Sequence, residues 1–340
     1  MTKSANATPQ QPVNLTFYGA HFMFFSEPRK ELMVLSNENF STPYGLYSLK
    51  ASDLEEQRSI VSLYRFPQDN GQPFAANGTE NFIFASITSG DGRDSRITRI
   101  AWWGDTSVLV NAPTGQSFGS IAYDESLGKI FAVIGSNEEP STINCYDHLT
   151  GRKLYSVAVG GNTIDNLVVD QDTHTLYFFP LEETQVGYFS TENQKPEIKY
   201  IEIPGDDLFG NRAAYDHQAK KLYMPVVESN GGTAIQVIDT TTNLPLPTIP
   251  IPYLIGGNIS LTINPLKNVL YVLDTSIGET SISWIDTQTS MITPLLTDGR
   301  AYFCIGLAVE NINESEDRLY TIEGGPTENA IVPIKVKYAN

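Results

Sequence analysis

Four stretches of the 340-residue sequence share one pattern: IAYDESLGKIFAV (121–133), LVVDQDTHTLYFF (167–179), AAYDHQAKKLYMP (213–225) and LTINPLKNVLYVL (261–273). In each, an apolar stretch ends in Asp or Asn, a polar turn follows, and the next strand opens with an apolar pair, usually Leu-Tyr. A fifth copy, 307–322, carries a three-residue insertion, and weaker copies precede it. The anchors are Leu32, Phe82, Ile130, Leu176, Leu222, Leu270 and Leu319, spaced 50, 48, 46, 46, 48 and 49 residues apart. A fixed period of this length is typical of a repeat architecture.

The third unit shows what each repeat contains. Its apolar runs SIAYD, KIFAVIG, TINCYD and LYSVAV are short, rich in Ile, Val and Tyr, and separated by turn residues, which predicts four strands joined by tight turns. Four antiparallel strands form one propeller blade. We therefore predict an all-β, seven-bladed β-propeller of four-stranded antiparallel blades, with residues 1–340 as a single domain.

The last unit supplies only three strands before the chain stops. The segment PVNLTFY, residues 12–18, precedes the first strand of unit one and is expected to complete the last blade, while residues 1–11 are expected to be flexible. Such a closure removes an exposed sheet edge, which otherwise invites aggregation.

The third strand of several units ends in an Asp-led turn. These turns read YDHLTG from Tyr146, IDTTTN from Ile238 and IDTQTS from Ile285. An Asp that accepts backbone hydrogen bonds from the following residues suits a tight hairpin turn. Together with the Leu-Tyr anchors, these turns resemble the YVTN-type, lactonase-like β-propeller superfamily, which implies the fold but not one function.

Ligands of propellers bind where loops enter the innermost strands, because these loops converge at the mouth of a central channel. Several of these loops carry polar or aromatic side chains. The candidates for catalysis are His21, Arg212 and Tyr302, and those for substrate binding are Phe118, Ser120, Asn166, Phe209, Asn211, Asn258 and Phe303. Arg212 would bind a carbonyl or enolate oxygen, and His21 or Tyr302 would donate or accept a proton.

The resemblance also implies a divalent metal held by a Glu and by Asn or Asp side chains around the channel. Oxygen ligands suited to calcium would come from Asp165, Asn166, Asn211 and Asn258. No Glu occurs in these loops, and Arg212 would place a positive charge beside the ion. A metal-dependent, lactonase-like hydrolase is therefore an alternative to the main hypothesis.

Two further local patterns favour structural explanations. Residues 115–119 match G-x-S-x-G, but they enter a strand, whereas a nucleophile elbow lies on a strand-to-helix turn. His148, His174 and His217 fall in hairpin turns, where we expect solvent exposure.

The composition limits the partners. With 22 basic and 39 acidic residues the net charge is −17, which argues against nucleic acid or an anionic membrane. No stretch is apolar enough to span a membrane, and no secretory signal is present, so we expect a soluble protein. Six sequons, at Asn6, Asn14, Asn39, Asn77, Asn258 and Asn313, leave secreted and cytoplasmic locations open.

The two cysteines, Cys145 and Cys304, fall in different units, so we predict two free thiols. Cofactor-binding motifs such as G-x-G-x-x-G are absent from the sequence. The main hypothesis is a monomeric, cofactor-free enzyme of the cyclase or cycloaddition, lyase or isomerase type. It would act on an apolar or aromatic, oxygen-bearing small molecule, as in natural-product biosynthesis. The alternative from another class is a non-catalytic propeller that binds a protein or a glycan.

Overall fold

The computed structural model of the protein describes most of the chain. The described residues are 5–15, 20–36, 45–54, 57–62, 74–77, 82–88, 94–136, 139–159, 164–180, 183–205, 207–208, 213–228, 231–251, 258–276, 279–298, 306–324 and 329–338. They fall into two compact units, one comprising Met1–Ser62, Asn230–Ile235 and Thr248–Asn340, and the other Leu63–Ser229 and Gln236–Pro247.

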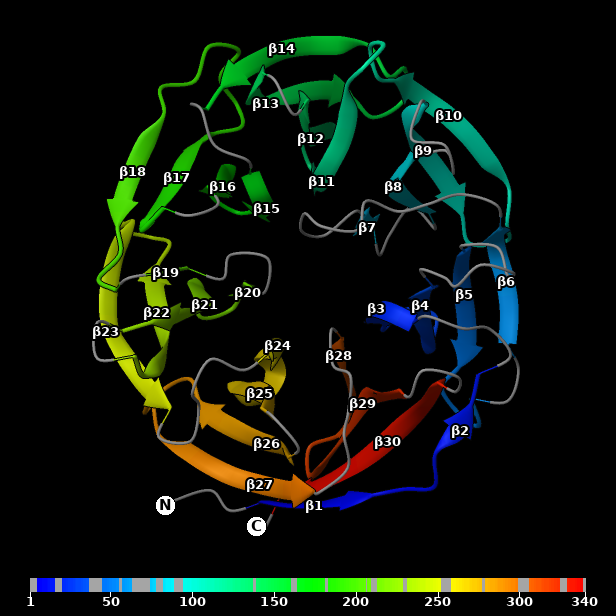
Figure 1. Ribbon diagram of the computed structural model, residues 1–340, viewed down its shortest axis with the longest axis vertical. Helices are drawn as coiled ribbons and strands as arrows, with labels where there is room; N and C mark the ends of the chain where they lie inside the picture. Colours follow the sequence, from blue (N-terminus) through cyan, green and yellow to red (C-terminus); the bar gives the residue numbers. More distant parts are fainter. Residues whose placement is uncertain are drawn as a thin grey trace. The chain divides into compact units, whose positions relative to one another are not determined.

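The described strands form seven antiparallel sheets, six of them made from consecutive strands and the seventh completed by the N-terminal strands (Figure 1). Blade one contains β3 (Ala20–Ser26), β4 (Glu31–Ser36), β5 (Gly45–Lys50) and β6 (Gln57–Ser62). Blade two contains β7 (Phe74–Asn77), β8 (Phe82–Thr88), β9 (Ser95–Ala101) and β10 (Thr106–Asn111). Blade three contains β11 (Ser117–Asp124), β12 (Lys129–Ser136), β13 (Glu139–Asp147) and β14 (Lys153–Ala158). Blade four contains β15 (Ile164–Asp170), β16 (Thr175–Pro180), β17 (Gln185–Ser190) and β18 (Lys199–Glu202).

The other three blades follow the same order. Blade five contains β19 (Asp207–Leu208), β20 (Ala214–Asp216), β21 (Lys221–Val227), β22 (Thr233–Asp239) and β23 (Leu244–Ile251), with the two short strands β19 and β20 both paired to β21. Blade six contains β24 (Asn258–Asn264), the 3₁₀ turn η2 (Pro265–Lys267), β25 (Val269–Ser276), β26 (Glu279–Asp286) and β27 (Ile292–Asp298). Blade seven contains β28 (Leu307–Asn313), β29 (Glu316–Gly324) and β30 (Asn329–Tyr338). The predicted seven-bladed, all-β propeller fold is confirmed.

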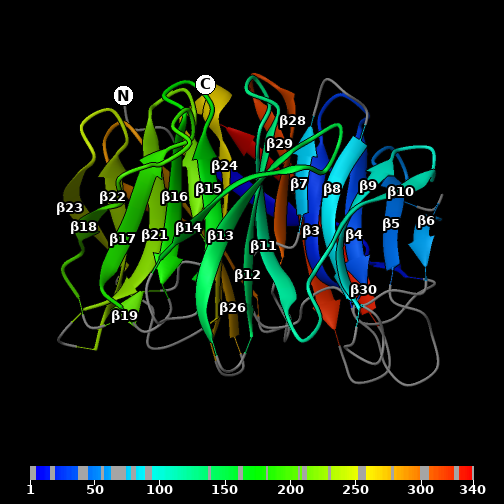
Figure 2. The ribbon, with the colours of Figure 1, turned by 90° about the horizontal axis from the view of Figure 1, so that it is seen from above.

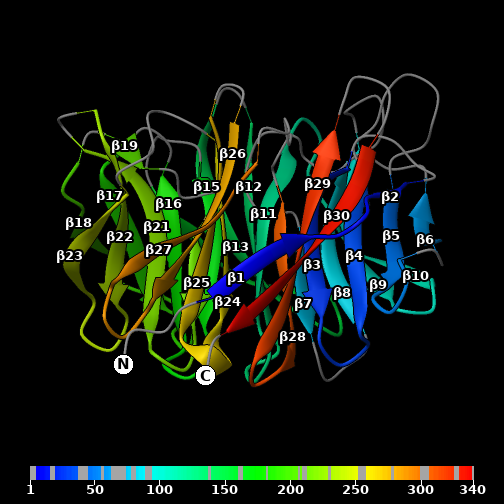
Figure 3. The same ribbon diagram turned by 90° about the horizontal axis from the view of Figure 1, so that it is seen from below.

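The N-terminus completes blade seven, as the sequence predicts. Strand β1 (Ala5–Pro9) pairs antiparallel with β30, and β2 (Val13–Asn14) pairs with the same strand (Figure 3). Pairing therefore begins at Ala5, within the segment expected to be flexible and ahead of the expected closing strand 12–18. Ala5 and Ala7 pack against the core of blades six and seven. Because their side chains are small, the alternation of apolar and polar residues in β1 is a weak signal for a strand.

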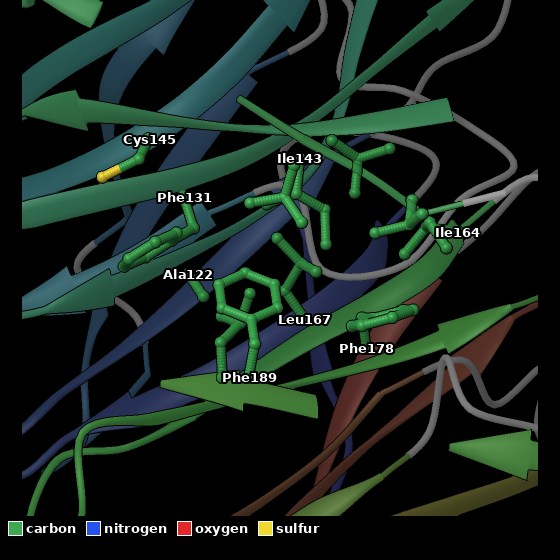
Figure 4. Close-up of a cluster of buried hydrophobic side chains, with 12 residues drawn as sticks. Ala122, Phe131, Ile143, Cys145, Ile164, Leu167, Phe178 and Phe189 are labelled. Atoms are coloured by element: carbon green, nitrogen blue, oxygen red, sulfur yellow. The ribbon is translucent and has the colours of Figure 1, made fainter. Parts of the chain in front are cut away.

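The hydrophobic core lies between neighbouring sheets. Between blades three and four, Phe131 of β12 and Phe189 of β17 have ring centroids 6.2 Å apart, and Leu167 and Leu176 join the same cluster (Figure 4). These side chains are buried, as expected for apolar residues on the faces of stacked sheets. Figure 2 shows the strands of these two blades lying along one another.

In five blades the turn between the first and second strands shares one backbone conformation. The residue just before the second strand has a positive φ, between 50° and 61°. These residues are Lys30, Gly128, His174, Lys220 and Asn268. At Gly128 a side chain would also collide with the His148 ring, 2.5 Å from the position of a Cβ atom, so this turn requires glycine.

Candidate functional site

The predicted site residues that the structure describes lie near the beginnings of β3, β11, β15 and β24. His21 is the second residue of β3, Asn258 is the first of β24, and Asp165 and Asn166 are the second and third of β15. The structure describes only the backbone of His21, Asp165 and Asn258. The candidates Phe209, Asn211, Arg212, Tyr302 and Phe303 lie outside the described residues. The roles predicted for all of these residues stay predictions.

Two predicted binding residues do meet. Ser120 of β11 and Asn166 of β15 are both buried, and the Ser120 hydroxyl donates to Asn166 Oδ1 at 3.2 Å. The backbone N–H of Leu167 donates to the Ser120 hydroxyl at 3.1 Å and to Asn166 Oδ1 at 2.8 Å. This buried group joins the inner strands of blades three and four, because buried polar atoms need hydrogen-bond partners.

Phe118, another predicted binding residue, lies in the core. Its side chain is 1% exposed and packs edge-on against Tyr146, with ring centroids 6.1 Å apart. Its backbone N–H donates to the Ser95 hydroxyl of blade two at 2.9 Å. The neighbouring Ser117, the first residue of β11, is exposed instead.

The opposite ends of the inner strands carry a repeated carboxylate arrangement. Asp124 and Asp170 end β11 and β15, and both are fully buried. One oxygen of each accepts backbone N–H groups of its own turn. The other oxygen accepts a threonine hydroxyl of the following blade, from Thr191 at 2.6 Å for Asp124 and from Thr240 at 3.1 Å for Asp170. These two Asp–Thr pairs therefore join blade three to blade four and blade four to blade five.

The histidines of the hairpin turns differ from expectation. Only His217 is exposed. His174 is partly buried because its Nδ1 lies 3.0 Å from the buried carboxylate of Asp124, and His148 is partly buried because its Nδ1 lies 2.9 Å from the carbonyl of Gly128. Both contacts reach a neighbouring turn, and sequence position alone does not reveal them.

A third buried carboxylate, Asp317 of β29, joins blades six and seven. It accepts hydrogen bonds from Tyr271 at 2.6 Å, Tyr338 at 2.7 Å and Asn264 at 2.9 Å, and it pairs with the ammonium group of Lys267. Burial is the main cause that raises the pKa of both tyrosines above the ordinary value. Sequence reasoning missed this cluster, although Tyr271 belongs to a Leu-Tyr pair. Its role is structural, because the carboxylate is fully buried and its oxygens have partners from the two sheets.

Of the side chains predicted to hold a metal, only that of Asn166 is described, and its oxygen accepts hydrogen bonds from Ser120 and Leu167. Within the described ranges, no group of three or more His, Cys, Asp or Glu side chains is arranged to hold a metal ion. No helix in the described part of the chain is long and apolar enough to cross a membrane.

The fold defines the class of protein as a seven-bladed β-propeller. Comparison with models of known protein families finds no match, and comparison with curated proteins finds none either. The resemblance to the YVTN-type, lactonase-like superfamily therefore stays a prediction.

Proposed function

We propose that the protein binds a small molecule with side chains at the beginnings of its inner strands and acts on it as a cofactor-free enzyme. The reaction would be of the cyclase or cycloaddition, lyase or isomerase type. The substrate would be an apolar or aromatic molecule that carries oxygen.

The observation that carries this proposal is the contrast between the two ends of the inner strands. At one end, Asp124 and Asp170 repeat from blade to blade and are bonded to Thr191 and Thr240 of the next blade. At the other end the residues differ between blades: Ser120 is the fourth residue of β11 and Asn166 the third of β15, and the two are buried and bonded to each other. A fold built from repeats needs the same structural residues in each repeat, so an end of the strands where the residues differ is where we place a ligand.

The chemistry assigned to these ends needs no nucleophile. The guanidinium of Arg212 would stabilise negative charge as it develops on a carbonyl or enolate oxygen. His21 or Tyr302 would transfer a proton, and Phe209 and Phe303 would hold the apolar part of the substrate.

A second candidate function, a protein-binding propeller without catalysis, is favoured by apolar side chains on the outside of blades two and three. Trp103 and Leu149 are each more than 60% exposed, and Val108, on the outermost strand β10, is also exposed. Exposed apolar groups of this size occur at sites of protein association.

The test compares three proteins in an extract of metabolites from the source organism, each with and without EDTA, with mass spectrometry as the readout. The proteins are the wild type, Asn211→Ala/Arg212→Ala, and the control Asn6→Ala/Arg152→Ala. The control removes the same two side-chain types at exposed positions in β1 and in the β13–β14 turn.

Consumption of a compound by the wild type and the control, but not by the Asn211/Arg212 variant, would support the proposal. Consumption that EDTA abolishes would favour the metal-dependent alternative. If no protein consumes a compound, the enzyme proposal fails, and the protein-binding candidate is tested next through Trp103 and Leu149.

A further inference from the structure

Blade four departs from the repeat between its third and fourth strands. In blades three, five and six the third strand ends in Asp147, Asp239 or Asp286, whose carboxylate accepts N–H groups two and three residues on. The connections that follow are short, 148–152, 240–243 and 287–291. In blade four the third strand ends at Ser190, and the connection 191–198 is longer. The propeller fold does not require this extra segment.

The start of the longer connection is held firmly. Thr191 is fully buried, and its hydroxyl donates to Asp124 at 2.6 Å. Its backbone carbonyl accepts from the Lys129 ammonium at 2.5 Å and from the Tyr155 hydroxyl at 3.2 Å, and both donors belong to blade three. The segment therefore leaves the sheet from a fixed point, which favours a preformed site over a loose loop.

A cavity of about 210 Å³ lies beside this segment. Its lining residues come from β16, β17, the 191–198 connection and β18. They are Thr175, Tyr188, Phe189, Ser190, Asn193, Glu197 and Lys199. Tyr188 is partly exposed, and its ring stacks on that of Tyr177 with centroids 5.9 Å apart and planes inclined by 28°.

Four polar side chains of this cavity are available for a ligand. Within the described residues, the side chains of Tyr188, Asn193, Glu197 and Lys199 make no hydrogen bond or ion pair. Lys199 offers donors, Glu197 offers acceptors, and Asn193 offers both. The hydroxyls of Ser190 and Thr175 bond within the protein, to the N–H of Glu192 and to Thr173. The lining holds one acidic and one basic residue, so it is neutral in a chain whose net charge is −17.

We infer that blade four binds a single neutral sugar residue in this cavity. A sugar ring has an apolar C–H face that packs on an aromatic ring, and its hydroxyls need donors and acceptors together. The volume equals that of roughly seven water molecules at about 30 Å³ each, which suits one sugar ring. Drug-sized ligands occupy larger pockets, of about 300 Å³ or more. This site does not rest on the function proposed for the inner strands.

The experiment is saturation-transfer NMR on the full-length protein with glucose, galactose, mannose, N-acetylglucosamine and fucose at millimolar concentrations. We expect at least one sugar to receive saturation, and Tyr188→Ala to weaken its binding by about tenfold or more. Tyr200→Ala is the matched control, because Tyr200 is also an exposed tyrosine of blade four but packs on Phe178 and does not line the cavity.

A second pair of variants covers the case in which Tyr188→Ala does not fold. Lys199→Met with Glu197→Gln changes two exposed residues and should weaken binding as well, whereas Lys153→Met should not. Lys153 begins β14 as Lys199 begins β18. The inference is overturned if no sugar receives saturation, or if both cavity variants bind as the wild type does.

Discussion

Single buried carboxylates explain why Asp and Thr recur in this sequence. Asp124 is fully buried, yet it accepts hydrogen bonds from the hydroxyls of Thr191 and Ser126, from the N–H of Leu127, and lies 3.0 Å from His174 Nδ1. A buried charge is tolerated only when hydrogen bonds replace the lost water. Each such Asp therefore stabilises its own turn and the contact with the next blade together.

Replacing Asp124 with Ala is expected to lower the free energy of unfolding by about 2–4 kcal/mol, because the N–H of Leu127 loses its acceptor and the Thr191 hydroxyl keeps only the His174 carbonyl, at 3.1 Å. Urea unfolding measures the change. Asp172→Ala is the control: Asp172 is exposed and pairs at the surface with Lys220, so its loss is expected to stay below about 1 kcal/mol. Equal losses in the two variants would contradict the structural role of Asp124.

The turn that begins at Asp147, between β13 and β14, predicts that the stability of the fold depends on pH. The hydroxyl of Thr150 donates to Asp147 Oδ1 at 2.6 Å, and this bond, followed by the N–H of Thr150, lowers the pKa of the Asp147 carboxyl below its ordinary value. A lowered pKa in the folded state means that Asp147 stabilises the fold above its unfolded pKa of about 3.9, and that this stabilisation is lost as the pH falls through the folded value.

Thr150→Val should therefore raise the pKa of Asp147, as followed by NMR titration of its carboxyl carbon. Leu149→Ala serves as the comparison, because Leu149 contributes only its backbone N–H, at 3.2 Å, and that bond is kept. An unchanged Asp147 pKa in Thr150→Val would show that the hydroxyl bond does not cause the shift.

At the scale of the strand, the outermost strands of blades five and seven show how sheet edges are protected from pairing with another chain. Blade seven covers β30 with β1 and β2. In blade five the outermost strand β23 contains Pro245, Pro247 and Pro250, which cannot donate backbone hydrogen bonds to a further strand. Both devices limit edge-to-edge association.

Deleting residues 1–18 is expected to lower the melting temperature by about 5 °C or more, since it uncovers β30 and removes Ala5 and Ala7 from the core of blades six and seven. Scanning calorimetry or circular dichroism measures the midpoint. The variant Asn6→Ser/Thr8→Ser alters only exposed side chains of β1 and should melt as the wild type does. An unchanged melt of the truncated protein would refute closure by the N-terminal strand.

At the scale of the whole molecule, seven similar sheets provide the scaffold, and acidic residues outnumber basic ones. From the net charge of −17 we expect neither nucleic acid nor an anionic membrane as a partner, since both require a basic surface. The repeat accounts for the common parts of the blades. We place specific binding at parts that differ between blades, such as the 191–198 connection beside the proposed sugar site.

The cysteines test the blade assignment. Cys145 lies on β13 and is fully buried, and burial raises the pKa of its thiol to about 11. Cys304 lies outside the described residues. We expect thiol labelling of the unfolded protein to count two free thiols, and Cys145 to resist labelling in the folded protein at neutral pH. Cys145→Ala should reduce the unfolded count to one, whereas a wild-type count of zero would contradict the placement of the cysteines in different blades.

Much of the fold was predictable because its signals are local. The two side chains of a Leu-Tyr pair point to opposite faces of the sheet, and both are buried, as Leu176 and Tyr177 are. The Asp-led turns form within a few residues. The N-terminal closure was predictable from the missing strand of unit seven. Its start at Ala5 was not, because small residues and a proline carry little strand signal.

The candidate site was less predictable. The sequence predicts Ser120 and Asn166 as separate binding residues, whereas they bond to each other in the interior. It predicts a binding role for Phe118 from its aromatic ring, and the structure places this side chain in the core. The sequence carries one signal for the cavity of blade four. Ser190 stands where blades three, five and six have an Asp, and the connection after it is longer. This signal can be recognised only by comparing blade four with those blades.

The sequence by itself determined the number of blades, their strand order and the turns that join them, because periodicity and turn chemistry act over a few residues. The tertiary structure alone decided which side chains are buried, which polar groups meet, and where a cavity remains. Those outcomes depend on contacts between residues about 46 positions apart, such as Ser120 and Asn166, and no local pattern specifies them.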